Sequence, residues 1–254
     1  MIAKAIIFDI DGTAVDSPSQ KLPTERLVRA SQNIQKTYYL SAATGRCWTF
    51  GKDIIQGMGL KDLCIISGGT QICDPRTGEV VWQKDITPNA LGEVIKIFEE
   101  NGKQRLIFND YTEEDYFSGG VLPKDFDTSQ RVNWLSQSFV PDELAIKLHS
   151  KLDLVEGVTC VMVVSQKPGC RDMHIVNENA TKEHAIDELL DRLGIKKEEA
   201  IGIGDGHNDI HLFNAVGKKV AIGNAVEELK KATDLVINDV SSDGLAIYFE
   251  ELSK

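Results

Sequence analysis

Residues 2–8, Ile-Ala-Lys-Ala-Ile-Ile-Phe, constrain the fold of this chain more than any other segment. The run is rich in β-branched and apolar residues on both faces of a possible strand, so both faces need a cover. Strands of this kind are typical of the centre of a parallel sheet with helices on each side. Because the run ends at Asp9, we expect a buried strand with an acidic residue at its carboxyl end.

Helical and extended patterns alternate on either side of a long interruption. The sequence predicts helices at residues 23–36, 49–58, 182–193, 208–216, 225–232 and 244–252, and strands at 38–42, 63–66, 200–204, 220–222 and 235–237. Such alternation predicts an α/β fold with a Rossmann-like, doubly wound parallel sheet.

The interruption, residues 84–180, has a different pattern. It predicts helices at 88–100 and 141–152, strands at 105–108, 159–165 and 172–176, and an irregular stretch rich in Gly, Asp and Ser before residue 141. We therefore expect two domains. Residues 1–83 and 181–254 form the core, and residues 84–180 form an inserted α+β domain.

Composition limits the partners and the location. The formal charge of −11 makes nucleic acid and anionic membrane surfaces poor partners. The sequence shows no stretch long and apolar enough to span a membrane, and its five cysteines are odd in number and lack CxxC spacing. We expect a cytoplasmic protein, monomeric or homodimeric, whose partner is a small molecule.

Two aspartates follow the first predicted strand. In an extended chain residues i and i+2 point the same way, so Asp9 and Asp11 present their carboxylates side by side, and Gly12 then lets the chain turn. Open parallel sheets bind ligands at the carboxyl ends of their strands, where this pair lies. Taken alone, such a pair is as easily turn-forming as functional.

A second acidic cluster follows the predicted strand at 200–204 and contains Asp205 and Asp209. Four carboxylates at one sheet edge repel one another unless a hard divalent cation lies among them, and Mg²⁺ is the natural choice. An EF-hand is excluded because the twelfth residue from Asp205 is Val216, where a glutamate is required. A dinucleotide fingerprint fails because His207 replaces the third glycine, and no P-loop motif is present.

Thr44, the Gly45 amide and Lys182 supply donors for an anionic group. A hydroxyl, a backbone N–H and an ammonium can share the negative charge of a transferring phosphoryl group. Individually, Thr44 is more often a turn residue and Lys182 a solvated lysine. Their order along the chain and their positions at strand and helix ends favour the functional interpretation.

These motifs together resemble the haloacid dehalogenase superfamily of phosphatases, in particular its Cof-like sugar-phosphatase branch, over nearly the whole chain. The four motifs are Asp9-Ile-Asp-Gly-Thr13, Thr44-Gly-Arg46, Lys182 and Gly204-Asp-Gly-His-Asn-Asp209, accompanied by the branch-typical Ser67-Gly-Gly69, Ala221-Ile-Gly-Asn-Ala225 and Asp243-Gly-Leu245. Glu183 stands where the branch usually has glycine, and the insert is short and irregular near residues 111–133. In this branch a large cap is inserted between the second and third motifs.

The resemblance implies a mechanism. Asp9 would attack phosphorus to form an aspartyl-phosphate, and Asp11 would protonate the leaving oxygen and then deprotonate the hydrolytic water. Mg²⁺ would be held by Asp9, the Asp11 carbonyl, Asp205 and Asp209. The phosphoryl group would be bound by Thr44, Gly45, Arg46, Lys182 and Asn208, although Arg46 at a helix start is as easily a surface cation.

Several alternatives stay open at this point. A phosphomutase would pass the phosphoryl group to a second hydroxyl, and a metabolite sensor would not turn over at all. His207 and His211 have the spacing of a zinc pair but lack a third ligand nearby. Four insert residues, Asp110, Tyr111, Arg171 and His174, are weak candidates for substrate contact. The resemblance implies either a sugar phosphate or phosphoglycolate as the substrate, and no residue pattern in the sequence favours one over the other.

Overall fold

A computed structural model describes residues 3–16, 22–102, 105–127 and 129–254 of the chain. The chain divides into two compact units, one running to Trp82 and resuming at Thr181–Lys254, the other comprising Gln83–Ala180. The first is called the core unit below and the second the insert unit. Within the described ranges no helix has the length and apolar character needed to cross a membrane.

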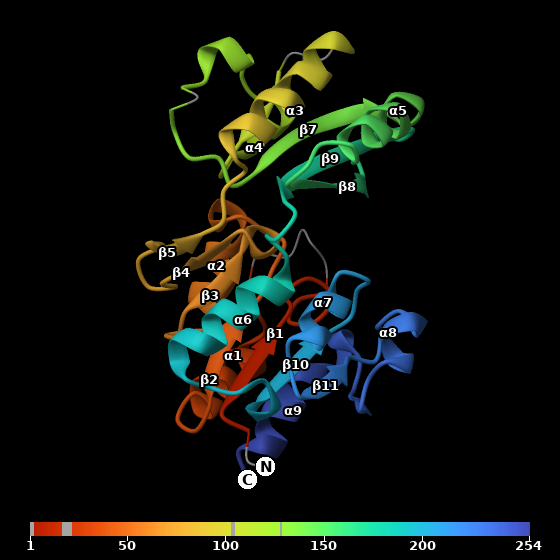
Figure 1. The fold of residues 1–254 in the computed structure, drawn as a ribbon. Helices are drawn as coiled ribbons and strands as arrows, with labels where there is room; N and C mark the ends of the chain where they lie inside the picture. Colours follow the sequence, from red (N-terminus) through yellow and green to blue (C-terminus); the bar gives the residue numbers. More distant parts are fainter. Residues whose placement is uncertain (1–2, 17–21, 103–104, 128) are drawn as a thin grey trace. The chain divides into compact units, whose positions relative to one another are not determined.

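The core unit is built on a five-stranded parallel sheet (Figure 1). Its strand order is β12-β11-β10-β1-β2, so segments from the two ends of the chain are neighbours. The strands are β1 (Ala5–Phe8), β2 (Tyr39–Ala42), β10 (Ala200–Gly204), β11 (Lys218–Ala221) and β12 (Leu235–Val236). The predicted α/β fold with a doubly wound parallel sheet is confirmed.

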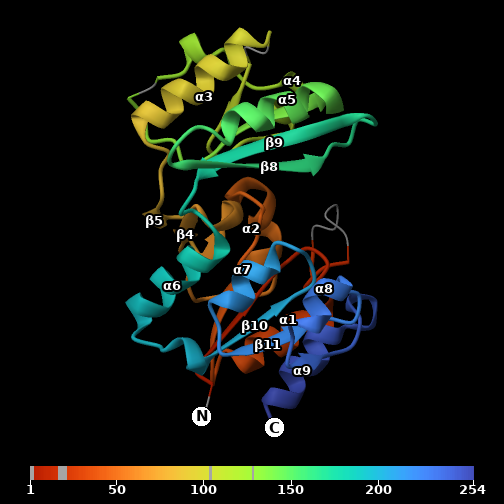
Figure 2. The same ribbon diagram turned by 45° about the vertical axis from the view of Figure 1, so that its right-hand side comes forward.

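Helices cover both faces of this sheet, as Figures 1 and 2 show. Side chains of β1 alternate between the faces: Ile6 and Phe8 belong to one buried cluster, and Ala5 and Ile7 to the other. The first cluster includes residues of α1 (Glu25–Ile34), α2 (Trp48–Gly57) and α9 (Gly244–Leu252), and the second includes residues of α6 (Lys182–Leu193), α7 (Asp209–Asn214) and α8 (Glu227–Lys231). All four β1 residues are 0% exposed, which explains why each of these four positions is apolar.

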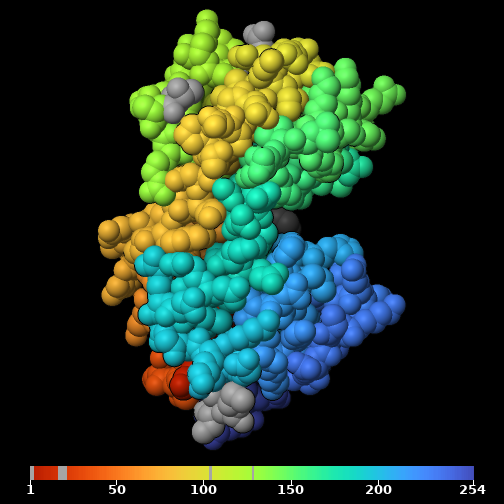
Figure 3. Space-filling view, viewed as in Figure 1, coloured from red at the N-terminus to blue at the C-terminus, as the bar shows by residue number. Residues whose placement is uncertain are grey.

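A space-filling view shows the same burial from outside (Figure 3). On the face seen in this view the chain from Thr181 onward, cyan to blue, occupies most of the core unit, and little of the red N-terminal segment is visible.

A small three-stranded sheet, β3-β4-β5, completes the core unit. It comprises β3 (Cys64–Ile66), β4 (Gln71–Cys73) and β5 (Val80–Gln83), with the 3₁₀ turn η1 (Ser67–Gly69) between the first two. β3 lies alongside the chain leaving β2 through the bridge between Ala43 and Ile65. Two further 3₁₀ turns, η3 (Lys197–Glu199) and η4 (Val240–Ser242), connect core elements.

The insert unit is an antiparallel sheet backed by helices. Its strand order is β6-β7-β9-β8, with β6 (Ile107–Phe108), β7 (Leu135–Pro141), β8 (Val158–Val164) and β9 (Cys170–Asn177). The helices α3 (Pro88–Glu100) and α5 (Asp142–Leu152) pack against it in one apolar cluster. A short helix, α4 (Glu113–Ser118), and the turn η2 (Pro123–Asp125) precede β7.

The prediction that the chain before residue 141 is irregular was wrong in two places, because this segment contains α4 and β7. The sequence did not predict strand β7, because its residues Ser136, Gln137 and Ser138 are polar although they are buried. The register also shifts between Gln137 and Val140, where Phe139 has φ of 57°, and this irregularity breaks the alternation that marks a strand.

Candidate active site

The first functional side chains lie at the carboxyl ends of neighbouring strands. Phe8 of β1 is in register with Ile203 of β10 and Ala42 of β2, so the residues that follow emerge at one sheet edge. The Asp9 amide donates to the Ile203 carbonyl at 2.9 Å. This geometry brings Asp9 and Asp205 to the same edge, as the strand pattern predicted.

Lys182 joins two of the carboxylates. Its side chain is 3% exposed, and its Nζ lies 2.6 Å from Asp9 Oδ1 and 2.7 Å from Asp209 Oδ1. Lys182 is the first residue of α6, whose N-cap Thr181 accepts from the His184 amide. The chain passes so close to Gly69 that a Cβ there would collide with the Thr181 backbone. The glycine at position 69 therefore lets the backbone of Thr181 and Lys182 pass close to it, and this close packing positions Lys182.

Asp209 is fully buried, and both oxygens of its carboxylate accept hydrogen bonds. While Oδ1 accepts from Lys182, Oδ2 accepts from the backbone amides of Asp205 and Gly206, at 2.9 Å each. These bonds organise the loop after β10, so Asp209 shapes the site as well as contributing charge to it.

Asp205 and the adjacent Gly12 are held by two side chains to which the motifs assigned no role. Thr13 Oγ1 donates to Asp205 Oδ1 at 2.8 Å, and Asn224 Nδ2 donates to the carbonyl of Gly12 at 2.8 Å. Gly12 has φ of 82°, a conformation suited to glycine, and a Cβ there would strike the Asp205 carboxylate. Both residues belong to motifs, Thr13 to Asp9-Ile-Asp-Gly-Thr13 and Asn224 to Ala221-Ile-Gly-Asn-Ala225, but Asn224 lies 212 residues from Gly12, so neither motif indicated their contact.

Asp11 makes a different contact from Asp9. Its carboxylate pairs with Arg46, whose Nη2 lies 2.6 Å from Oδ1. The Arg46 side chain is only 11% exposed, so the alternative of a surface cation is wrong.

The predicted phosphate-binding groups occupy three different settings. Thr44 is fully buried, and its Oγ1 accepts from the Arg46 amide at 3.1 Å. Gly45 is exposed and has open space where a side chain would lie. Asn208 is exposed at the start of α7, and within the described residues Lys182 has hydrogen bonds to Asp9 and Asp209 but none to Asn208.

Three carboxylates close to one ammonium leave the site with excess negative charge. Burial raises the pKa of Asp9 to about 8, although Lys182 opposes the shift. Burial also raises the pKa of Asp205 to about 6, against the hydrogen bond from Thr13. For Lys182, burial disfavours the charged form, but Asp209 and Asp9 outweigh it and raise the pKa above its usual range. The ammonium is therefore charged, and the carboxylates still need a cation.

The donor set fits a hard divalent cation. Asp9, Asp205 and Asp209 each offer an oxygen, and these oxygens lie within 4.8 Å of one another. Oxygen-only ligands with uncompensated charge are what Mg²⁺ prefers. His207 and His211 contact carboxylates outside this group, with His207 Nδ1 3.0 Å from Glu228 and His211 Nδ1 3.6 Å from Glu183.

The four insert candidates are placed as follows. Arg171 pairs with Asp142 at 2.9 Å, and Asp110 accepts from the Tyr111 amide. His174 packs against Trp134 with the two rings tilted and their centroids 4.6 Å apart. Burial lowers the pKa of His174 to about 4, so its ring is neutral at physiological pH. Their expected part in substrate contact stays a prediction.

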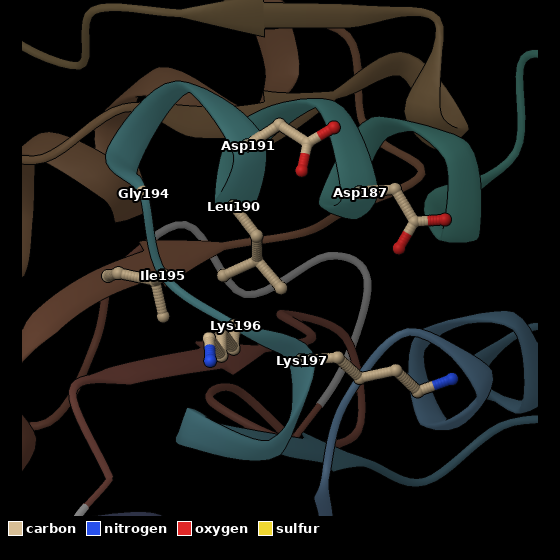
Figure 4. A pocket seen from close by; sticks show the side chains of 7 residues that line it. All are labelled: Asp187, Leu190, Asp191, Gly194, Ile195, Lys196 and Lys197. Carbon is tan, nitrogen blue, oxygen red and sulfur yellow. The ribbon is translucent and has the colours of Figure 1, made fainter.

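A surface hollow of about 420 Å³ lies elsewhere on the core unit (Figure 4). It is lined by Asp187, Leu190, Asp191, Gly194, Ile195, Lys196 and Lys197. These residues lie along α6 and in the turn that follows it, whereas Lys182 begins that helix. The hollow therefore shares no residue with the acidic site.

Comparison with known proteins gives consistent matches. A family model described as haloacid dehalogenase-like hydrolase matches residues 6–249. The phosphoglycolate phosphatase of Archaeoglobus fulgidus is 26% identical over 242 residues, which cover 95% of this chain and 93% of that protein. The structure of TM0651 from Thermotoga maritima has a TM-score of 0.81 at 21% identity, covering 98% of this chain and 97% of the other. The subclass IIB sugar phosphatase BT4131 has a TM-score of 0.70 at 23% identity, covering 98% of both chains.

Proposed function

Because the chain belongs to the haloacid dehalogenase-like hydrolases and is a phosphoric monoester hydrolase, we propose that it cleaves a small phosphate monoester with Asp9 as nucleophile and Mg²⁺ as cofactor. The observation that carries this proposal is the buried group of Asp9, Lys182 and Asp209 beside Asp205 at the ends of β1 and β10. A nucleophile, a cation and an excess of carboxylates at one sheet edge are what phosphoryl transfer to an aspartate requires.

Asp9 is suited to attack because its orientation is fixed. Its side chain is 7% exposed, and the Lys182 ammonium anchors Oδ1 at 2.6 Å. Anchoring one oxygen sets the rotamer, so little reorganisation precedes attack by the carboxylate. The Asp9–phosphorus bond forms as the bond to the leaving oxygen breaks, and the product is an aspartyl-phosphate.

Mg²⁺ would be held by Asp9, Asp205, the backbone carbonyl of Asp11 and Asp209. When bound, it would offset the repulsion between the carboxylate and the phosphate dianion. Asp209 is already committed to two backbone amides and to Lys182, which suits it to supporting the site as much as to direct ligation.

The transferring group needs donors around its oxygens. The Gly45 residue is exposed and Lys182 Nζ lies 2.6 Å from Asp9 Oδ1, which supports both as donors to the phosphoryl oxygens. Thr44 Oγ1 accepts from the Arg46 amide, and its hydroxyl hydrogen would donate to a phosphoryl oxygen. Asn208 at the exposed start of α7 would complete the set.

Asp11 would move the protons. It gives a proton to the leaving oxygen as the substrate alcohol departs, and it later takes one from the water that attacks the aspartyl-phosphate. The second step releases inorganic phosphate and restores the Asp9 carboxylate. The net reaction is hydrolysis of one ester bond by one water molecule.

We also propose that residues 84–180 form the cap that selects the substrate, with core residues 1–83 and 181–254 supplying the chemistry. The compact insert unit, Gln83–Ala180, supports this division. One relative named above is a phosphoglycolate phosphatase and one structural neighbour is a sugar phosphatase. We therefore take a sugar phosphate or a phosphoglycolate-like ester as the substrate class.

Release of inorganic phosphate from p-nitrophenyl phosphate tests the proposal. We expect turnover with Mg²⁺, none with a chelator, and none for Asp9→Asn, while Asp191→Asn at the remote hollow behaves as the unmodified protein. Release of free phosphate without an added acceptor also separates a phosphatase from a phosphomutase. Near-normal turnover by Asp9→Asn would remove Asp9 from the role of nucleophile.

A further inference from the structure

The ion pair between Arg46 and Asp11 has a specific geometry that the proposed reaction leaves unexplained. Arg46 Nη2 lies 2.6 Å from Asp11 Oδ1, and Nε lies 3.0 Å from Oδ2 and 3.2 Å from Oδ1. The two side chains are 11% and 27% exposed. A planar fork of this kind fixes the plane of a carboxylate as well as its position, which a lysine cannot do.

Arg46 is itself held from three directions. Its Nη1 donates to the carbonyl of Phe50 at 3.1 Å. Its backbone amide donates to Thr44 Oγ1 at 3.1 Å, and its carbonyl accepts from the Ser67 amide at 2.8 Å. Because both ends of the residue are anchored, the guanidinium is a rigid support for the carboxylate in front of it.

We propose that Arg46 is a positioning residue that orients the Asp11 carboxylate for proton exchange with the leaving group. The proposal rests on the proposed function, in which Asp11 is the acid and base. Oδ1 takes two of the three contacts, including the shortest, whereas Oδ2 takes one contact of 3.0 Å. Oδ1 is thus the more tightly anchored oxygen, and we assign proton exchange to Oδ2.

A direct contact between Arg46 and the substrate phosphate is the rival interpretation, and it is the role expected from the motif. In the structure Nε and Nη2 donate to Asp11 and Nη1 donates to Phe50. A phosphate could reach only the second N–H of Nη1 or Nη2, because the edge of the guanidinium that carries Nε is engaged by Asp11. The geometry therefore favours action through Asp11.

The two interpretations differ in how the effect of a substitution depends on the leaving group. A poor leaving group such as phenol needs a proton as it departs, whereas p-nitrophenol departs readily without one. For Arg46→Gln, we expect kcat/KM to fall about tenfold or more with phenyl phosphate and about threefold or less with p-nitrophenyl phosphate. The ratio kcat/KM is used because it covers the steps through departure of the phenol.

Two further variants complete the comparison. Arg46→Lys keeps the charge but not the fork, so we expect its kcat/KM to fall more with phenyl phosphate than with p-nitrophenyl phosphate, as for Arg46→Gln. This variant replaces Arg46→Gln in the test if Arg46→Gln does not fold. Arg26→Gln is the matched control, because Arg26 makes a similar fork to Glu250, with distances of 2.9 and 2.6 Å, outside the site. We expect this control to change neither substrate's kcat/KM.

A double-mutant cycle isolates the route of the effect. If Arg46 acts through Asp11, then Arg46→Gln should cost little more once Asp11→Asn is present. Equal losses on both phosphates, or a full additional loss on top of Asp11→Asn, would overturn the proposal in favour of a phosphate contact or a structural role. A wild-type kcat/KM of Arg46→Gln on phenyl phosphate would overturn it outright. Failure of the proposed function would show separately, as turnover that survives Asp9→Asn.

Discussion

Replacing Lys182 with methionine should destabilise the metal-free protein strongly. The change keeps most of the side-chain length and removes the ammonium that lies 2.6 Å from Asp9 and 2.7 Å from Asp209. At an effective dielectric constant of about 20 the contact with Asp209 has a gross attraction of about 6 kcal/mol, the contact with Asp9 adds a similar amount once that carboxyl is ionised, and most of this attraction is offset by the cost of burying the ions. Removing one partner of a buried group of charges typically costs about 3–5 kcal/mol, and we expect a loss of unfolding free energy in that range.

The loss should also depend on pH, with a defined sign. Burial raises the pKa of Asp9 from 3.8 to about 8, so its contribution to stability is full below pH 3.8, falls as pH rises from there, and stays constant above about pH 8. Lys182 lowers this pKa, so in Lys182→Met the Asp9 carboxyl should titrate at higher pH still. The gap between the two proteins should be constant below about pH 8 and then widen by about 1.4 kcal/mol for each pH unit.

Urea unfolding with a chelator present, at pH 7 and pH 9, measures both effects. Lys4→Met is the matched control, because Lys4 pairs with Glu199 at 2.8 Å but is 56% exposed, and a surface pair is worth about 1 kcal/mol or less. A loss below about 1 kcal/mol for Lys182→Met, or a gap that narrows as pH rises, would refute the reasoning.

Three further predictions follow from the same site. Thr13→Val should weaken Mg²⁺ binding about tenfold or more, because Asp205 loses the hydrogen bond that orients it, whereas Thr13→Ser should bind nearly normally in titration calorimetry. Mg²⁺ affinity should fall as pH drops from 7 to 5, because burial raises the pKa of Asp205 to about 6 and a proton then competes with the metal; an affinity independent of pH would contradict this. Gly69→Ala should lower the unfolding free energy by about 2 kcal/mol or more, because Gly69 has φ of 108° and its Cβ would meet the backbone of Thr181, while Gly92→Ala, where no atom lies within 4 Å of the added Cβ, should not destabilise.

Local patterns predicted those parts of the fold that local physics determines. Helix α6 was expected at residues 182–193 and is observed at Lys182–Leu193, because Thr181 caps its start and Gly194, with φ of 63°, ends it. Strand β10 was equally predictable, since every residue of Ala200–Gly204 is buried. A strand that is buried on both faces has a nearly continuous run of apolar or small residues, which the sequence shows directly.

Features that depend on tertiary contacts were not predictable. Strand β7 contains polar residues that are buried only because the insert unit folds around them, so its sequence lacks the apolar alternation of a strand. At the site, the motifs identified the four carboxylates and Lys182, but not that Arg46 forms a fork with Asp11, 35 residues away. Which acceptor a long side chain reaches depends on the path of the backbone between the two residues, and short motifs do not encode that path.

The central claim is that Asp9 carries the phosphoryl group, and rapid acid quench during turnover tests it most directly. A phosphate monoester labelled in its phosphoryl group is mixed with the protein and Mg²⁺, the reaction is stopped in acid within milliseconds, and the peptides are mapped by mass spectrometry. We predict one added phosphoryl group on the peptide containing Asp9 and none in Asp9→Asn. Turnover with no labelled peptide at any quench time, or with the label on another residue, would contradict the account.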